Sequence, residues 1–362
     1  MRLRDSSRAN CTPLKIAVDA RNLAHDHRGL GRYARALLRR FVPRDDIAIT
    51  LVVERPWPGL AKRRFAKILG STRFDVAPRV RQPLVWHPWN GAFLDGGRAH
   101  VCTIADLAPF KFPAEDPIRR MREQAPFITA AARANRIITF SHASKHDLTT
   151  MLRIPADSVS VTYLGVDDSF EPGAASGNEA LMGQPYFLFV GDPGEPRKNF
   201  ELLYRALRRA WPNANGPRLA VLSQRDPALP GVLHVKGDTE DVERKDNAHL
   251  RALYHGAIAT AVPSLYEGFG MPVIESMACG TAVIAARASS LPEVAGEAAL
   301  LVDPTDETAW ADALTRVAND SSLRASLREL GLQNAKRFQW SVCAAQTQAV
   351  FEEVAALERN IP

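Results

Sequence analysis

Short apolar runs alternate with amphipathic stretches along most of this chain. Residues 14–18 (LKIAV) and 186–190 (YFLFV) have the length and composition of buried strands. Residues 29–41 (GLGRYARALLRRF) instead repeat apolar side chains at helical spacing. Further strand-like runs are residues 47–54, 137–140, 159–167, 218–223, 232–237, 257–262 and 281–286. Strands that alternate with helices in this way predict an α/β fold with parallel, doubly wound sheets.

Residues 264–280 (SLYEGFGMPVIESMACG) join two of these runs and predict a glycine-rich turn followed by one helix. Pro272 suits the first helical position, and Gly280 suits the left-handed residue that ends a helix. Gly268 and Gly270 allow the backbone to approach a ligand closely, and the following helix directs its unpaired N–H groups to the same place. The segment therefore predicts a site for an anionic ligand.

Two carboxylates frame this turn, Glu267 before it and Glu275, which we expect in the first helical turn. An ionised carboxylate only accepts hydrogen bonds, so it suits neighbouring hydroxyls on a sugar or ribose. Together with the anion site, this indicates a ligand that combines a polyol with phosphate. The alternative is that Glu275 complements the helix dipole and Glu267 is a solvated loop residue.

The segment after residues 186–191 carries two cations. A turn with two prolines and a glycine (DPGEP) brings Arg197 and Lys198 to the start of a helix. Arginine can bind a diphosphate through two nitrogens and lysine acts as a point charge, so the pair is suited to a diphosphate. The alternative is surface charge flanking a helix.

Residues 29–34 (GLGRYA) also match the G-x-G-x-x-A fingerprint of dinucleotide-binding proteins, with Glu54 as the candidate ribose acid. That fingerprint requires its first glycine directly after the strand, and here about ten residues intervene. An NAD-dependent oxidoreductase therefore remains only a remote alternative.

The composition is that of a globular protein of 362 residues, long enough for two domains. We find no apolar run of about 18 residues and no signal-peptide centre in residues 1–13, so we expect a cytoplasmic protein. The four cysteines lack metal or redox spacing. A net charge of +6 indicates an anionic partner. Because we find no zinc-finger or RNA-binding signature, we do not expect nucleic acid.

Residues 55–74 combine basic and apolar side chains and predict a basic amphipathic helix. Such a helix can lie in an anionic membrane interface, which places the protein peripherally at the inner face of a membrane. The alternative is an ordinary solvated helix face. The basic residues are Arg55, Lys62, Arg63, Arg64, Lys67 and Arg73, and the apolar ones are Trp57, Leu60, Phe65, Ile68 and Leu69.

The motif EGFGMPVIE resembles the E-x7-E motif of retaining nucleotide-sugar glycosyltransferases of family 4, which have the GT-B fold. SLPEVAG at residues 290–296, EPRKN at 195–199 and GLGRY at 29–33 resemble further segments of that family. The resemblance implies two Rossmann-like domains whose parallel sheets face each other across a cleft. Residues 1–170 would form the acceptor-side domain and 171–340 the nucleotide-sugar domain, with a helix at 341–362 crossing back to the first.

The resemblance also implies roles for individual residues. Glu267 would hold hydroxyls of the donor sugar and Glu275 the ribose. Arg197 and Lys198 would stabilise the leaving diphosphate, and Asp106 would stand at the catalytic edge of the first domain. Further donor contacts would come from Gly29, Gly31, Arg32, Gly268, Phe269, Gly270 and Met271. The family pattern is broken at Ala105, which stands where a histidine usually precedes this aspartate.

The implied reaction moves a hexose, for which we expect GDP-mannose as donor, to the hydroxyl of a glycan or lipid-linked acceptor. Such a transfer belongs to surface polysaccharide or glycolipid synthesis. We expect no cofactor and no metal, because the sequence has no Asp-x-Asp arranged for a bridging cation. Alternatives are a GT-B epimerase or phosphorylase, and a catalytically impaired sugar-nucleotide-binding subunit, which Ala105 keeps open. Asp106 could also be a structural aspartate that caps its loop.

Overall fold

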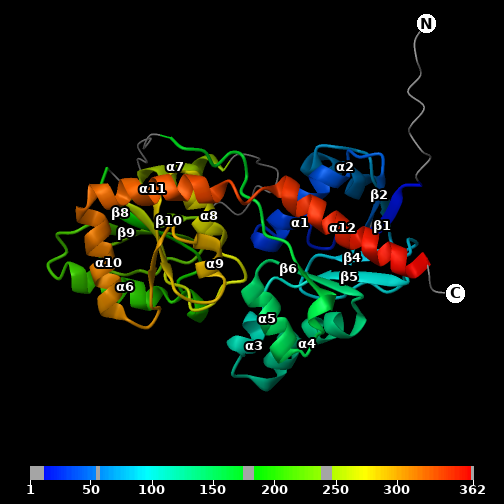
Figure 1. Ribbon diagram of the computed structural model, residues 1–362, viewed down its shortest axis with the longest axis horizontal. Helices are drawn as coiled ribbons and strands as arrows, with labels where there is room; N and C mark the ends of the chain where they lie inside the picture. The colour runs from blue at the N-terminus through cyan, green and yellow to red at the C-terminus, as the bar shows by residue number, and fades with distance from the viewer. Residues whose placement is uncertain (1–11, 54–57, 174–182, 238–246, 360–362) are drawn as a thin grey trace, which may run out of the picture.

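The computed structural model describes residues 12–53, 58–173, 183–237 and 247–359. Two parallel sheets dominate it, one in each lobe of the molecule (Figure 1). The first sheet has the order β3-β2-β1-β4-β5-β6-β7 and the second β10-β9-β8-β11-β12-β13. Their strands are β1 (Leu14–Asp19), β2 (Ile47–Val52), β3 (Asp75–Ala77), β4 (Leu84–His87), β5 (Ala99–Thr103), β6 (Arg136–Thr139), β7 (Val159–Val161), β8 (Tyr186–Val190), β9 (Arg218–Ser223), β10 (Val232–Lys236), β11 (Ala259–Val262), β12 (Ala282–Ala286) and β13 (Leu300–Val302).

Helices connect these strands and cover the sheets. In the first lobe they are α1 (Gly29–Phe41), α2 (Pro58–Leu69), α3 (Ala108–Lys111), α4 (Pro117–Arg133), α5 (His142–Met151) and the 3-10 turn η1 (Ala156–Ser158). In the second they are the 3-10 turn η3 (Pro196–Lys198), α6 (Phe200–Ala210), α7 (Ala248–Gly256), α8 (Met271–Ala278), α9 (Leu291–Ala295), α10 (Glu307–Asn319) and α11 (Ser321–Ala335). Ser141 caps α5, since its side chain accepts a hydrogen bond from the Ser144 N–H.

The order of each sheet reverses direction once, at β1/β4 in the first and at β8/β11 in the second. Ligands of open α/β sheets bind beyond the carboxyl ends of the strands at such a switch point. The segment after β8 carries Arg197 and Lys198, and the segment after β11 carries Glu267. The topology therefore brings together two motifs that lie about 70 residues apart in sequence.

The last helix, α12 (Trp340–Arg359), returns to the first lobe (Figure 1). It packs against α1 and the central strands of the first sheet. Phe351 is fully buried there, with its ring centroid 5.5 Å from Trp86 and 6.0 Å from Phe41. Burying three aromatic rings together stabilises the return of the chain, because each removes a large apolar area from water.

Helix α2 forms within the predicted basic segment, but its apolar side is turned inward. Phe65, Ile68 and Leu69 are buried in the core of the first lobe, while Arg63 and Arg64 are exposed. The predicted residues Glu54, Arg55 and Trp57 lie outside the described part of the chain. Among the described residues, no helix is long and apolar enough to cross a membrane.

Two local predictions for α8 were wrong by one residue, whereas a third element has its expected bounds. The helix expected over residues 29–41 is confirmed, because α1 begins at Gly29 and ends at Phe41. Pro272 is the second residue of α8, since Met271 precedes it. Glu275 is the fifth residue of α8 and so lies beyond the first turn. The dipole interpretation of Glu275 is weakened, because the effect of a helix terminus falls off within one turn.

Candidate functional site

Glu267 lies between the two cations predicted to bind a diphosphate. Its Oε1 is 2.6 Å from Lys198 Nζ, and its Oε2 is 3.0 Å from Arg197 Nη1. The loops that carry them are tied together, because the Leu265 N–H donates to the Arg197 carbonyl at 2.8 Å. The side-chain amide of Asn199 adds bonds to the carbonyls of Pro263 and Pro304. The cluster is thus held by both side chains and backbone.

The electrostatics keep Glu267 ionised. Burial opposes its charge, but Lys198 and Arg197 outweigh burial and hold the pKa of this carboxyl below its ordinary value. Burial would likewise lower the pKa of Arg197, yet Glu267 and Asp106 raise it above its ordinary range. The site therefore presents a buried, charged carboxylate beside two half-buried cations.

The backbone around Glu267 is fixed by hydroxyl groups. Ser289 and Ser290 both donate to the Glu267 carbonyl, at 2.8 and 2.9 Å, and Ser290 also donates to the Phe269 carbonyl at 3.0 Å. Ser264 donates to the carboxylate itself at 2.8 Å. A group held by this many bonds is preorganised, which favours stabilisation of charge that develops during a reaction. The sequence prediction missed these serines, although Ser290 is the first residue of the SLPEVAG motif.

Glu275 forms a second cluster at the domain boundary. It is 1% exposed, and Tyr254 donates a 2.9 Å hydrogen bond to its Oε2. Arg32 of α1 reaches across from the first lobe and places Nη1 2.6 Å from the other oxygen, Oε1. Gly29 faces Met271 at the start of α8, since a Cβ there would lie 3.7 Å from the methionine sulfur. The predicted N-terminal segment and the E-x7-E helix therefore meet.

Two of the predicted glycines have a packing role in the described structure. A Cβ on Gly31 would lie 1.8 Å from the Asp26 carbonyl oxygen. The absence of a side chain on Gly31 therefore leaves room for the backbone that precedes α1. A Cβ on Gly268 would lie 2.6 Å from the Ala105 carbonyl oxygen. Gly268 therefore lets the backbone of the first domain pack closely against the second. Gly270 has φ of 100°, a left-handed conformation that favours glycine.

Asp106 follows β5 and makes the structural bond that was one of its two predicted interpretations. Its carboxylate accepts the Ala108 N–H at 2.9 Å, which is the predicted structural bond within its own loop. Burial raises the pKa of this carboxyl, while Arg197 opposes that shift. Asp106 thus lies within electrostatic reach of the cation cluster across the domain boundary.

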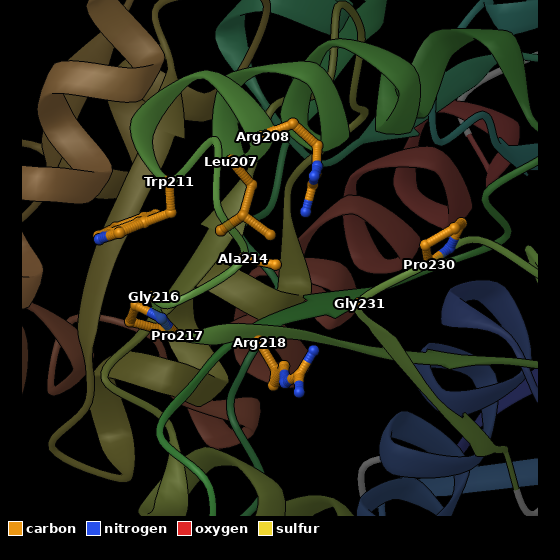
Figure 2. Close-up of a pocket in the computed structure, with 9 residues that line it drawn as sticks. All are labelled: Leu207, Arg208, Trp211, Ala214, Gly216, Pro217, Arg218, Pro230 and Gly231. Carbon is orange, nitrogen blue, oxygen red and sulfur yellow. The ribbon is translucent and has the colours of Figure 1, made fainter.

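The pocket in Figure 2 lies away from these clusters. Leu207 and Arg208 of α6, Trp211 and Arg218, the first residue of β9, contribute to its lining. Its volume of about 20 Å³ is enough for a single water. It opens at the amino end of β9, opposite the carboxyl ends where ligands of this fold class bind. In the described residues, no group of three or more His, Cys, Asp or Glu is arranged to hold a metal.

Comparison with known proteins finds similarity to glycosyltransferases. A family model for glycosyl transferases group 1 matches residues 184–320, which contain both clusters' second-domain residues. O-antigen chain mannosyltransferase B of Escherichia coli is 29% identical over 271 residues, 68% of this chain and 68% of that protein. MMP alpha-(1->4)-mannosyltransferase of Mycolicibacterium hassiacum is 32% identical over 238 residues, 61% of this chain but only 54% of that protein.

Solved structures confirm the fold. Sucrose-phosphate synthase of Thermosynechococcus elongatus superposes with a TM-score of 0.69 over 95% of this chain and 99% of that one, at 18% identity. HepE of Anabaena, solved in complex with UDP and glucose, has a TM-score of 0.65 over 94% and 100% of the two chains, at 14% identity. The predicted GT-B architecture of two Rossmann-like domains is therefore correct.

Proposed function

We propose that this chain, whose residues 184–320 match the group 1 glycosyl transferases, transfers a hexose from a nucleoside-diphosphate sugar to an acceptor hydroxyl with retention of configuration. The observation that carries the proposal is the cluster of Glu267, Arg197 and Lys198 at the β8/β11 switch point. One acceptor group for sugar hydroxyls stands there beside two cations for a diphosphate, which is the chemistry of a nucleotide-sugar donor.

In this mechanism the protein mainly stabilises the leaving diphosphate. Negative charge grows on the diphosphate as the bond to the sugar breaks, and Arg197 and Lys198 bind that charge more strongly in the transition state. The leaving group itself accepts the proton of the acceptor hydroxyl on the same face of the sugar. Glu267 orients the sugar and Glu275 the ribose, and Asp106 borders the acceptor side. The proposal includes no metal and no cofactor.

We assign mannose as the sugar and GDP as the nucleotide, with a glycan or lipid-linked acceptor of surface polysaccharide or glycolipid synthesis. The support comes from two relatives that are named mannosyltransferases, one of them for an O-antigen chain. The solved neighbour with UDP makes uridine nucleotides the competing donor class. Isothermal calorimetry with GDP, UDP and dTDP decides between them, and tighter binding of UDP than of GDP contradicts the assignment.

An assay of nucleoside diphosphate release tests the reaction class. A transferase releases the diphosphate from its donor much faster when an acceptor is added. An epimerase interconverts sugars without an acceptor, a phosphorylase requires phosphate, and an impaired binding subunit releases nothing. If the rate of diphosphate release does not change with any acceptor offered, the proposed transfer is contradicted.

We also propose peripheral contact with an anionic membrane through the basic face of α2. Arg63, Arg64 and Lys67 are exposed on it, and each such charge is worth about 1 kcal/mol near an anionic surface. Replacing these three and Lys62 with glutamine should abolish sedimentation with anionic vesicles at low salt. If the variant still sediments, the contact lies on α4, where Ile118 and other apolar side chains are exposed. Protein that never sediments contradicts any membrane contact.

A further inference from the structure

Tyr266 precedes Glu267 in the E-x7-E segment, and its side chain reaches into the opposite domain. The residue is 5% exposed. Its hydroxyl accepts a 3.0 Å hydrogen bond from the Leu107 N–H and donates a 2.8 Å bond to Asp147 Oδ2. These partners are 159 and 119 residues away in sequence, and both belong to the first domain. One phenol hydroxyl therefore bridges two groups across the domain boundary.

The binding site for this ring is built by the first domain alone. Asp147 on α5 is fixed by Lys111 of α3, whose Nζ lies 2.8 Å from Asp147 Oδ1. Lys111 Nζ also lies 5.7 Å from the Tyr266 ring centroid, and Phe112 packs beside the ring at 6.3 Å. Asp147 is itself buried. A buried carboxylate that is paired with a lysine and a phenol makes a specific acceptor for a hydroxyl at this one position.

Tyr266 also contacts proposed site residues or their neighbours in both domains. Leu107, which donates to the Tyr266 hydroxyl, is the neighbour of Asp106. The Tyr266 carbonyl accepts a 3.1 Å hydrogen bond from Arg197 Nη1, the nitrogen that also contacts Glu267. Any shift of the first-domain loop relative to the second domain must therefore stretch the bonds of Tyr266.

We propose that Tyr266 is a positioning residue that aligns the Asp106 loop of the first domain with Glu267 and Arg197 of the second. This inference rests on the proposed transferase function and adds to it a residue outside the carboxylate and cation set. Tyr266 acts through the domains that it joins. It therefore affects how often the two halves of the site are aligned, rather than how strongly the second domain alone binds a nucleotide.

The test is Tyr266→Phe, which removes the hydroxyl and keeps the ring. Two hydrogen bonds are lost, so we expect the catalytic constant to fall by about tenfold to a hundredfold. The dissociation constants for GDP and UDP, measured by calorimetry, should change less than threefold. The matched control is Tyr204→Phe, since the Tyr204 hydroxyl donates to the Pro230 carbonyl within the second domain. This control should leave both quantities unchanged.

A double-mutant cycle separates alignment from general loss of stability. If the hydroxyl acts through Asp147, then adding Asp147→Asn to Tyr266→Phe should reduce the catalytic constant much less than the product of the two single effects. If the effects of the two substitutions on the catalytic constant simply multiply, the proposal is overturned. It is also overturned if nucleotide affinity falls as much as turnover.

Small-angle scattering makes the test independent of catalysis. Without the hydroxyl the domains should be less firmly joined, so Tyr266→Phe should have a larger radius of gyration than the unmodified protein with GDP or UDP present. An unchanged radius together with normal turnover overturns the positioning role. If the unmodified protein shows neither transfer nor nucleotide binding, the proposed function fails, and the scattering comparison without nucleotide still decides whether Tyr266 joins the domains.

Discussion

In the second domain, Glu267 is paired with Arg197 and Lys198 on loops that follow neighbouring strands of one sheet. In the first domain, by contrast, Arg32 pairs with Glu275 of the second domain, and the loop after β5 contacts Tyr266 of the second domain. The second domain thus assembles its cluster from its own contacts, whereas the first contributes only when the two are docked. For the proposed transferase we therefore expect donor binding to depend mainly on the second domain and turnover to depend on both.

The largest effect should follow removal of a cation from the second-domain cluster. For Lys198→Ala we expect the catalytic constant to fall by about a hundredfold to a thousandfold, because a preorganised group that stabilises developing charge is lost. The donor Michaelis constant should rise less. Arg197→Lys should not restore full activity, because an ammonium cannot reproduce the guanidinium geometry.

Steady-state kinetics measures this effect, with circular dichroism to show that each variant is folded. The control is Arg208→Ala on α6, a cation that faces the pocket of Figure 2. Near-normal turnover of Lys198→Ala and Arg197→Lys would mean that these cations only flank a helix start.

The next effect should come from Glu275, where the two domains share a carboxylate. Glu275→Gln should weaken nucleotide binding by about 1.5 to 3 kcal/mol, because an amide offers a donor where a ribose hydroxyl needs an acceptor. It also removes the charge that Arg32 contacts from the first domain. Calorimetry with GDP measures the loss, and Glu329→Gln on α11 is the control. An unchanged affinity of Glu275→Gln for GDP would contradict the assignment of Glu275 to the ribose.

A smaller effect is expected where the domains touch without a charged group. Gly268→Ala places a Cβ 2.6 Å from the Ala105 carbonyl oxygen, so the domains must separate or the loop must shift. Such overpacking costs about 1 to 3 kcal/mol. Turnover should fall while nucleotide affinity changes little. Gly59→Ala is the control, because a Cβ there meets nothing within 4 Å. A parallel loss of affinity would place the clash within the donor site.

The smallest effect concerns pH. The folded state lowers the pKa of Glu267, so this carboxylate stabilises the fold above its ordinary pKa of about 4.3 and loses that contribution as pH falls through the lowered value. At neutral pH the unmodified protein should have a higher melting temperature than Glu267→Gln, and this difference should shrink in acid. Thermal unfolding from pH 7 to 3 measures it, with the exposed Glu201→Gln as control. A gap that widens in acid contradicts the assignment.

Much of the second domain could be predicted from sequence, because its information is local. Apolar runs fixed β8, β11 and β12, and Gly280 ends α8 with φ of 72°, as predicted. The pairing of Glu267 with Lys198 follows once two motifs are placed at the ends of neighbouring parallel strands. Errors of one residue, as at Glu275, arose because propensity does not fix the first helical residue.

The contacts between the domains were decided by tertiary structure alone. Nothing in local spacing shows that Tyr266 meets Leu107, that Arg32 meets Glu275, or that the apolar side of α2 faces the core. Each of these depends on how two separately folded sheets and the returning α12 dock, over separations of more than 100 residues for the first two. Periodicity reports which face of an element is apolar, but the partner of that face is set by packing of the whole chain.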